Sequence, residues 1–181
     1  TAAGYADLAA KIPAGAEWII ADFVGTEPLI PDAWHILQDY INEFLGDPEA
    51  VAAGDPKAIA GLFEGLTLSG FAMQAIQSSR PASGAEHQYS HCWDMEDLCL
   101  EGKHVSHGFK VGIGTLMSTA ELEFLLEKDL ANLDVEACVE AWKDWDEMEK
   151  EIRTVLDGKP GHIARGLEET KGKYVDKDGL R

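Results

Sequence analysis

The sequence is poor in basic residues. Its 181 residues include 15 lysines and arginines against 33 aspartates and glutamates, which gives a formal net charge of −18. Without a basic face, a protein cannot displace the counterions that surround nucleic-acid phosphates, so we expect no nucleic-acid partner. An acidic surface otherwise bears chiefly on solubility and says little about the fold.

Cysteines and long apolar runs are also scarce. The three cysteines, Cys92, Cys99 and Cys138, match no CxxC spacing. We interpret them as reduced thiols of a cytoplasmic protein. No apolar run approaches the roughly 18 residues that cross a bilayer, so no membrane span is expected. The opening stretch "TAAGYADLAAK" lacks the basic start and long apolar segment of a signal peptide.

The remaining pattern is helical, and it predicts an all-α, multi-helix fold with at least six helices and little or no sheet, in one domain over residues 1–181. The clearest helix begins at Asp55 as N-cap, with Pro56 at the first helical position. Glycine is unfavourable inside a helix by roughly 1 kcal/mol relative to alanine. We therefore expect Gly61, Gly65 and Gly70 to mark a face packed closely against a neighbouring helix.

Further helices are predicted in the second half of the chain. Ser118 to Glu121 form a capping box that predicts a helix start. Asp134 predicts the start of a run whose aromatic and methionine positions, including Trp142 and Trp145, are expected in the core. Residues 105–113 alternate like a strand, but an isolated strand has no partner in a helical chain, so we favour a helix that begins after Ser106 as its cap.

Two histidines four residues apart are the first chemical signal. On a helix, His87 and His91 share one face, so both could bind one metal, or one could bind it while the other faces a substrate. His107 follows, and a carboxylate commonly completes an open catalytic site. The serines before this helix, at its N-terminal end, could hold an oxyanion. Ordinary surface or core histidines are the alternative, but they leave the glycines of "HGFKVGIG" unexplained.

Three stretches carry a family resemblance. "SSRPASGAEHQYSHCWDM" at 78–95 and "HGFKVGIGTL" at 107–116 are similar to the signature of the sn-glycerol-1-phosphate dehydrogenases. This family is a branch of the iron-containing alcohol dehydrogenase and glycerol dehydrogenase superfamily, which also resembles 3-dehydroquinate synthase in fold. The opening "AAGYADLAAKIPAGAEWIIAD" resembles the family segment GxGDxxxKxxxxxDW, although Ala6 and Glu17 depart from it. The aspartate of that segment, a metal ligand in the family, corresponds to Asp7.

The resemblance implies a helical, metal-binding C-terminal domain of a dehydroquinate synthase-like or iron-containing alcohol dehydrogenase fold. Its metal ligands would be Asp7, His87 and His107, which would hold Zn²⁺ or Fe²⁺. The metal would polarise the carbonyl of dihydroxyacetone phosphate, which the enzyme interconverts with glycerol 1-phosphate. His91 would be the catalytic residue facing the substrate.

The same resemblance supplies the remaining site assignments. Substrate binding is expected at Asp7, His91, Arg80 and Ser83, the last two at the phosphate of a phosphorylated polyol or ketone. The NAD(P) cofactor would be held by an N-terminal nucleotide-binding domain that we expect to be absent from this chain. "GIGTLM" at 112–117 begins like a dinucleotide loop but ends in Met117 and follows no strand. The chain alone is therefore expected to be an inactive fragment.

Other functions fit parts of the sequence. A glycerol or alcohol dehydrogenase would act on an unphosphorylated substrate, and a 3-dehydroquinate synthase-like domain would use a similar ligand set. A non-catalytic helical domain would bind no metal. Metal identity, NAD or NADP preference and a homo-oligomeric state are left open by the sequence.

Overall fold

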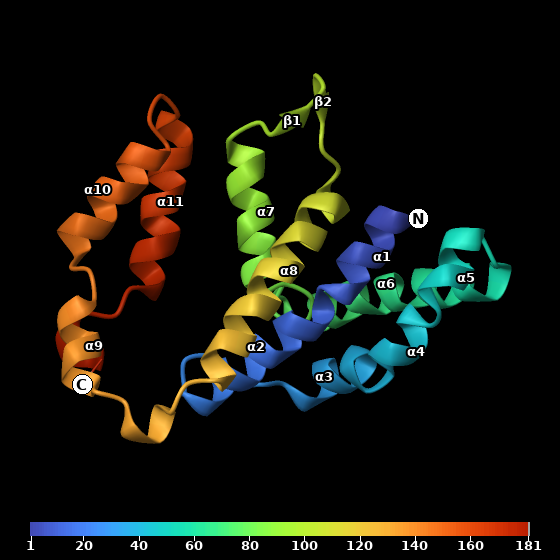
Figure 1. The fold of residues 1–181 in the computed structure, drawn as a ribbon, viewed down its shortest axis with the longest axis horizontal. Helices are drawn as coiled ribbons and strands as arrows, with labels where there is room; N and C mark the ends of the chain where they lie inside the picture. Colours follow the sequence, from blue (N-terminus) through green and yellow to red (C-terminus); the bar gives the residue numbers. More distant parts are fainter. Residues whose placement is uncertain (181) are drawn as a thin grey trace. The chain divides into compact units, whose positions relative to one another are not determined.

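The computed structural model describes residues 1–180 and divides them into two compact units, Thr1–Leu126 and the segment from Glu127 onward (Figure 1). The predicted all-α fold is confirmed: the only strands among the described residues are two of two residues each. They pair antiparallel, Cys99 opposite His104. All the candidate site residues lie in the first unit. Whether the whole chain acts as one catalytic domain stays a prediction.

The first unit contains α1 (Ala2–Ala9), α2 (Lys11–Phe23), α3 (Pro31–Leu37), η1 (Gln38–Tyr40), α4 (Ile41–Leu45), α5 (Pro48–Ala53), α6 (Pro56–Ile76), α7 (Ala85–Met95), β1 (Cys99–Leu100), β2 (Lys103–His104) and α8 (His107–Leu126). The second unit contains η2 (Leu130–Asn132), α9 (Val135–Ala141), α10 (Trp145–Val155), α11 (Pro160–Lys173) and α12 (Lys177–Leu180).

The apolar core of the first unit lies where α1, α3, α4 and α5 meet α6. It consists of the buried side chains Leu8, Leu37, Ile41, Phe44, Leu45, Val51 and Leu62. The predicted start of α6 is confirmed, because the Asp55 carboxylate accepts hydrogen bonds from the backbone N–H groups of Lys57 and Ala58 at 3.0 and 2.9 Å. Pro56 occupies its first turn.

Two of the three α6 glycines pack as predicted. A Cβ on Gly65 would lie 2.7 Å from Phe44 Cβ, and one on Gly61 would lie 3.6 Å from the Phe44 carbonyl oxygen. Gly70 has no heavy atom within 4 Å of that position, so the prediction is wrong there. Gly70 lies on a different face of α6 from the buried residues Ser69 and Ala72, so it points away from the packed side.

One helix within residues 1–180, α6, is long and apolar enough by length and composition to cross a membrane. The apolar runs of the sequence predict no such segment. A core helix of a soluble protein passes the same test, so one such helix is weak evidence for a membrane span. On one side of α6, Leu62, Gly65, Ser69 and Ala72 are buried.

Helix α8 packs against both α1 and α7, which lie on either side of it (Figure 1). A Cβ on Gly108 would lie 2.1 Å from the Ala3 carbonyl oxygen, and a Cβ on Gly114 would lie 2.4 Å from the Glu86 carbonyl oxygen. Real Cβ atoms are not found so close to backbone, so these two glycines permit an approach that no other residue allows. They account for two of the three glycines of the HGFKVGIG stretch, and a Cβ on the third, Gly112, would lie 2.8 Å from Ala6 Cβ.

The helical interpretation of residues 105–113 is confirmed, since α8 begins immediately after Ser106. The predicted helix start at Ser118 is wrong. The helix continues to Leu126, and the Ser118 hydroxyl is buried inside it without a hydrogen-bond partner. A capping sequence acts only where the preceding backbone leaves the helix, and here the packing of α8 keeps it helical.

The second unit divides the predicted run after Asp134 into two helices. Asp134 caps α9 as predicted, but Trp142 is extended (ψ 132°) and α10 begins anew with a capping box made by Asp144 and Glu147. Trp142 is 40% exposed, which contradicts its predicted place in the core. Its indole N–H instead donates to the Val175 carbonyl oxygen at 2.8 Å, because a side chain at a helix end is available for such a bond.

We expect Gly108→Ala to destabilise the chain by about 1–3 kcal/mol, because the added methyl forces α8 away from the α1 backbone. Gly70→Ala is the matched control. It adds a methyl group in open space within a helix, and it should raise the free energy of unfolding by about 0.5–1 kcal/mol. Urea denaturation followed by circular dichroism measures both, and equal effects would contradict the packing described.

Candidate metal centre

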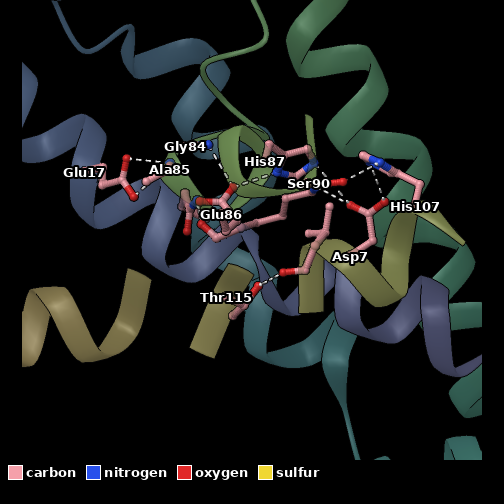
Figure 2. Close-up of polar contacts among 12 residues, drawn as sticks. Asp7, Glu17, Gly84, Ala85, Glu86, His87, Ser90, His107 and Thr115 are labelled. Atoms are coloured by element: carbon pink, nitrogen blue, oxygen red, sulfur yellow. Dashed lines mark hydrogen bonds and ion pairs between the residues drawn. The ribbon is translucent and has the colours of Figure 1, made fainter. Parts of the chain in front are cut away.

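Three helices of the first unit bring a carboxylate and two imidazoles together. Asp7 lies on α1, His87 on α7 and His107 on α8, and one ligand atom from each lies within 4.8 Å of the others. Asp7 Oδ1 is 3.8 Å from His87 Nε2, and Asp7 Oδ2 is 3.9 Å from His107 Nε2. Figure 2 shows the three side chains directed toward one another.

This donor set fits a divalent transition metal. Two imidazole nitrogens and one carboxylate oxygen suit Zn²⁺ or Fe²⁺ and leave a coordination position open for a substrate. In a tetrahedral zinc site with bonds of about 2.0–2.2 Å, the ligand atoms lie about 3.3–3.6 Å apart, so the three atoms would draw together by up to about 1 Å on binding an ion. That the three residues bind a metal stays a prediction.

The local sequence explains how α1 presents Asp7. Leu8, the next residue, is fully buried in the apolar core, which leaves Asp7 on the adjacent face of the same helix. Lys11 follows one turn later, and its ammonium lies 2.5 Å from Asp7 Oδ1. Because the Lys11 side chain is only 3% exposed, this ion pair compensates a charge that water does not reach. A bound cation would share Asp7 with Lys11.

The surroundings of His107 favour its neutral form. Burial lowers the pKa of His107, and the nearby His87 and His91 lower it further, while the Asp7 carboxylate acts in the opposite direction. A neutral imidazole has a lone pair available for a metal, so the site favours the protonation state that a ligand needs.

Two carboxylates, the buried Glu86 and the partly buried Glu17, hold the first turn of α7. The Gly84 N–H donates to Glu86 Oε1 at 2.8 Å, and the Ala85 N–H donates to Glu17 Oε2 at 2.9 Å. An oxyanion was expected to bind at this helix start, but the Gly84 and Ala85 amides donate to side chains of the protein itself. No role for Glu17 or Glu86 is predicted from the sequence, although Glu86 stands next to a candidate ligand histidine.

His91 lies beside the ligand set without belonging to it. Its ring is exposed, and it stacks near that of His107 with centroids 6.4 Å apart and an interplanar angle of 30°. Because its ring is exposed and lies beside His107, His91 could contact a molecule bound at the three candidate ligands. Separately, the buried Lys110 of α8 forms an ion pair with Asp94 of α7.

The two residues expected at the phosphate, Arg80 and Ser83, lie in the segment that connects α6 to α7. Arg80 follows α6 and forms an ion pair with Glu27, with 3.0 Å between Arg80 Nε and Glu27 Oε2. Ser83 is partly buried in the loop before α7. Their role at a phosphate stays a prediction. Cys92, Cys99 and Cys138 are free and exposed.

Comparisons with known proteins find relatives of one kind. A curated protein of Geobacillus thermodenitrificans is 40% identical over 114 residues, 63% of this chain and 28% of the relative. One of Bacillus licheniformis is 33% identical over 138 residues, 76% and 34% respectively. One of Pyrococcus horikoshii is 35% identical over 116 residues, 64% and 32%. Each is named as a glycerol-1-phosphate dehydrogenase with NAD(P)⁺ as coenzyme.

The chain is a relative of the glycerol-1-phosphate dehydrogenases. It spans about a third of the length of the curated relatives that it matches. No family model matches the sequence, and no solved structure matches it either. The resemblance predicted from residues 2–22, 78–95 and 107–116 is thus supported by relatives that carry the name of this family.

The stability of the metal-free chain should depend on pH through Glu17. Burial raises the pKa of this carboxyl above its ordinary value of 4.5, although the hydrogen bond from Ala85 opposes the shift. Below that value Glu17 is protonated in both the folded and the unfolded chain. As the pH rises through the higher folded-state pKa, ionisation costs the folded state more than the unfolded one.

We therefore expect the free energy of unfolding of the wild type to fall, relative to Glu17→Gln, as the pH rises from about 4 to 7. Glutamine retains an oxygen that can accept from the Ala85 N–H, so the comparison isolates the charge. Denaturant unfolding at a series of pH values checks this. A difference between the two proteins that is constant with pH would refute it.

Proposed function

We propose that the chain is the metal-binding, catalytic part of a cytoplasmic, NAD(P)-linked oxidoreductase that interconverts dihydroxyacetone phosphate and glycerol 1-phosphate. The convergence of Asp7, His87 and His107 from three helices carries the proposal. The relatives support it as well, because their name pairs glycerol 1-phosphate as substrate with NAD(P)⁺ as coenzyme.

In the proposed mechanism, Asp7, His87 and His107 hold the metal. A divalent ion, when bound, supplies a Lewis acid that polarises the ketone carbonyl and stabilises the negative charge that develops as hydride arrives. Lys11 balances the charge of the Asp7 carboxylate through its contact with Oδ1. His91 orients a substrate hydroxyl or passes its proton to water, which its exposed ring beside His107 permits.

The coenzyme belongs to another part of the proposed enzyme. Hydride transfer needs the nicotinamide carbon about 3–3.5 Å from the carbonyl carbon. Dinucleotides are commonly held by a parallel sheet, and residues 1–180 contain only the β1–β2 hairpin. The relatives are about three times as long as the matched segment, which supports a separate nucleotide-binding domain outside this sequence.

A glycerol or alcohol dehydrogenase is the second candidate. Arg80 is paired with Glu27, and the Gly84 and Ala85 amides donate to carboxylates. These groups are therefore engaged by the protein and are not free to bind a phosphate. An unphosphorylated substrate would need none of them.

The metal assignment predicts different results for two histidines one helical turn apart. His87→Ala should lose bound Zn²⁺ or Fe²⁺, because it removes a ligand. His91→Ala should retain the metal, because its ring stands beside the set. Metal content by mass spectrometry of the three purified proteins measures this, beside an NADH-oxidation assay in which we expect no turnover by the chain alone. Loss of metal in His91→Ala would contradict the assignment, and a metal-free wild type would favour a non-catalytic helical domain.

Binding measurements distinguish a phosphorylated from an unphosphorylated substrate. We expect the zinc-loaded chain to bind dihydroxyacetone phosphate at least ten-fold more tightly than dihydroxyacetone, with a shift of the His91 ring signals in NMR spectra. Equal affinities would favour the glycerol or alcohol dehydrogenase. Titration of the His87→Ala variant is the control for binding that does not depend on the metal.

A further inference from the structure

Glu86 is the one acidic side chain in the described residues that is completely buried, with a relative exposure of 0%. Acidic residues are almost never fully buried unless they are paired. Oε1 accepts from the Gly84 N–H at 2.8 Å and lies 2.7 Å from His87 Nδ1. Oε2 is buried without a partner. The position of this carboxylate therefore calls for an explanation that burial alone does not give.

The contact with His87 fixes what the ring can do. A carboxylate oxygen that accepts this hydrogen bond receives it from a proton on Nδ1. In the neutral ring the lone pair is then on Nε2, which lies 3.8 Å from Asp7 Oδ1. The carboxylate and the candidate metal centre thus lie on opposite sides of the same imidazole (Figure 2).

We propose that Glu86 is a positioning residue that holds His87 in the Nδ1–H tautomer and raises the basicity of Nε2 toward a divalent cation. This rests on the proposed metal site but not on the substrate or the coenzyme. A carboxylate on the far nitrogen orients a ligand imidazole and strengthens its bond to the ion. The backbone supports the arrangement, because the Glu86 carbonyl oxygen meets α8 at Gly114.

The two candidate ligand histidines are supported unequally. His107 Nδ1 faces only the Ser90 hydroxyl, at 3.3 Å, and its side chain is 47% exposed. A hydrogen bond to a charged partner is roughly twice as strong as one between neutral groups. His87 is therefore the better-fixed ligand, and Glu86 is the reason.

Glu17 provides a matched control. Both carboxylates accept from amides at the start of α7, but only Glu86 contacts His87. If Glu86 merely capped the helix, Glu86→Gln and Glu17→Gln would alter stability and leave the imidazole and the metal affinity unchanged. A positioning role predicts an effect at His87 that Glu17→Gln does not reproduce.

The first measurement needs no metal. Long-range ¹H–¹⁵N NMR spectra of the metal-free wild type, recorded above the pH at which its histidines lose their charge, should show His87 as the Nδ1–H tautomer. In Glu86→Ala, the Nε2–H form should appear. An Nε2–H tautomer in the wild type would overturn the proposal.

The second measurement is the affinity for Zn²⁺, by competition with a chromophoric chelator. We expect Glu86→Ala to weaken binding by about 10–100-fold. Glu86→Gln should recover part of that loss, because its amide oxygen still accepts from Nδ1–H without the charge. Glu17→Gln should bind like the wild type.

The outcomes separate the two proposals. A wild type that binds no Zn²⁺ would overturn the proposed function, while the tautomer would still decide the role of Glu86. Equal affinities of the wild type, Glu86→Gln and Glu86→Ala would overturn the positioning role and leave the metal site standing. If Glu86→Ala fails to fold, Glu86→Gln and the wild-type spectrum give the answer.

Discussion

The close approach of α8 to two other helices is the constraint on which the candidate site depends. At Gly108 and Gly114 the backbone of α8 touches carbonyl oxygens of α1 and α7, and a single methyl group would overlap them. The spacing of the three helices is therefore set by backbone contact, not by side-chain volume. His107 precedes the first contact, and His87 follows the residue that makes the second. The ligand geometry follows directly from that packing.

The apolar core and the candidate metal centre share α1. Leu8 is buried among the side chains of α3, α4 and α6, while Asp7 faces the histidines of α7 and α8. A helix of eight residues has little stability of its own, so its position comes from this burial. The core thereby fixes a carboxylate that would otherwise lie on a marginal helix.

The acidic composition has two separate structural uses. Asp47, Asp55, Asp134 and Asp144 each cap a helix start with the side-chain oxygen, where a negative charge also interacts favourably with the helix dipole. Asp7, Glu17 and Glu86 are instead removed wholly or partly from water around the histidines. Such buried charges add little stability and are typical of a functional site.

Local sequence patterns were enough to predict the all-α fold, several helix positions and part of the candidate metal centre. Helical spacing, the Asp55 cap and the His87–His91 pair each depend on hydrogen bonds or faces within a few residues, so they could be predicted without the fold. The family signature added Asp7 and His107, which no local pattern joins to His87.

Only the tertiary structure decided the rest. It showed that Gly65 is packed and Gly70 is not, that Ser118 lies inside a helix, and that Trp142 ends one. It also brought Glu17 of α2 against the first turn of α7, on which Glu86 lies. The physical reason is the same in each case: these outcomes depend on which segment, distant in sequence, lies against the residue, and local preferences carry no information about that partner.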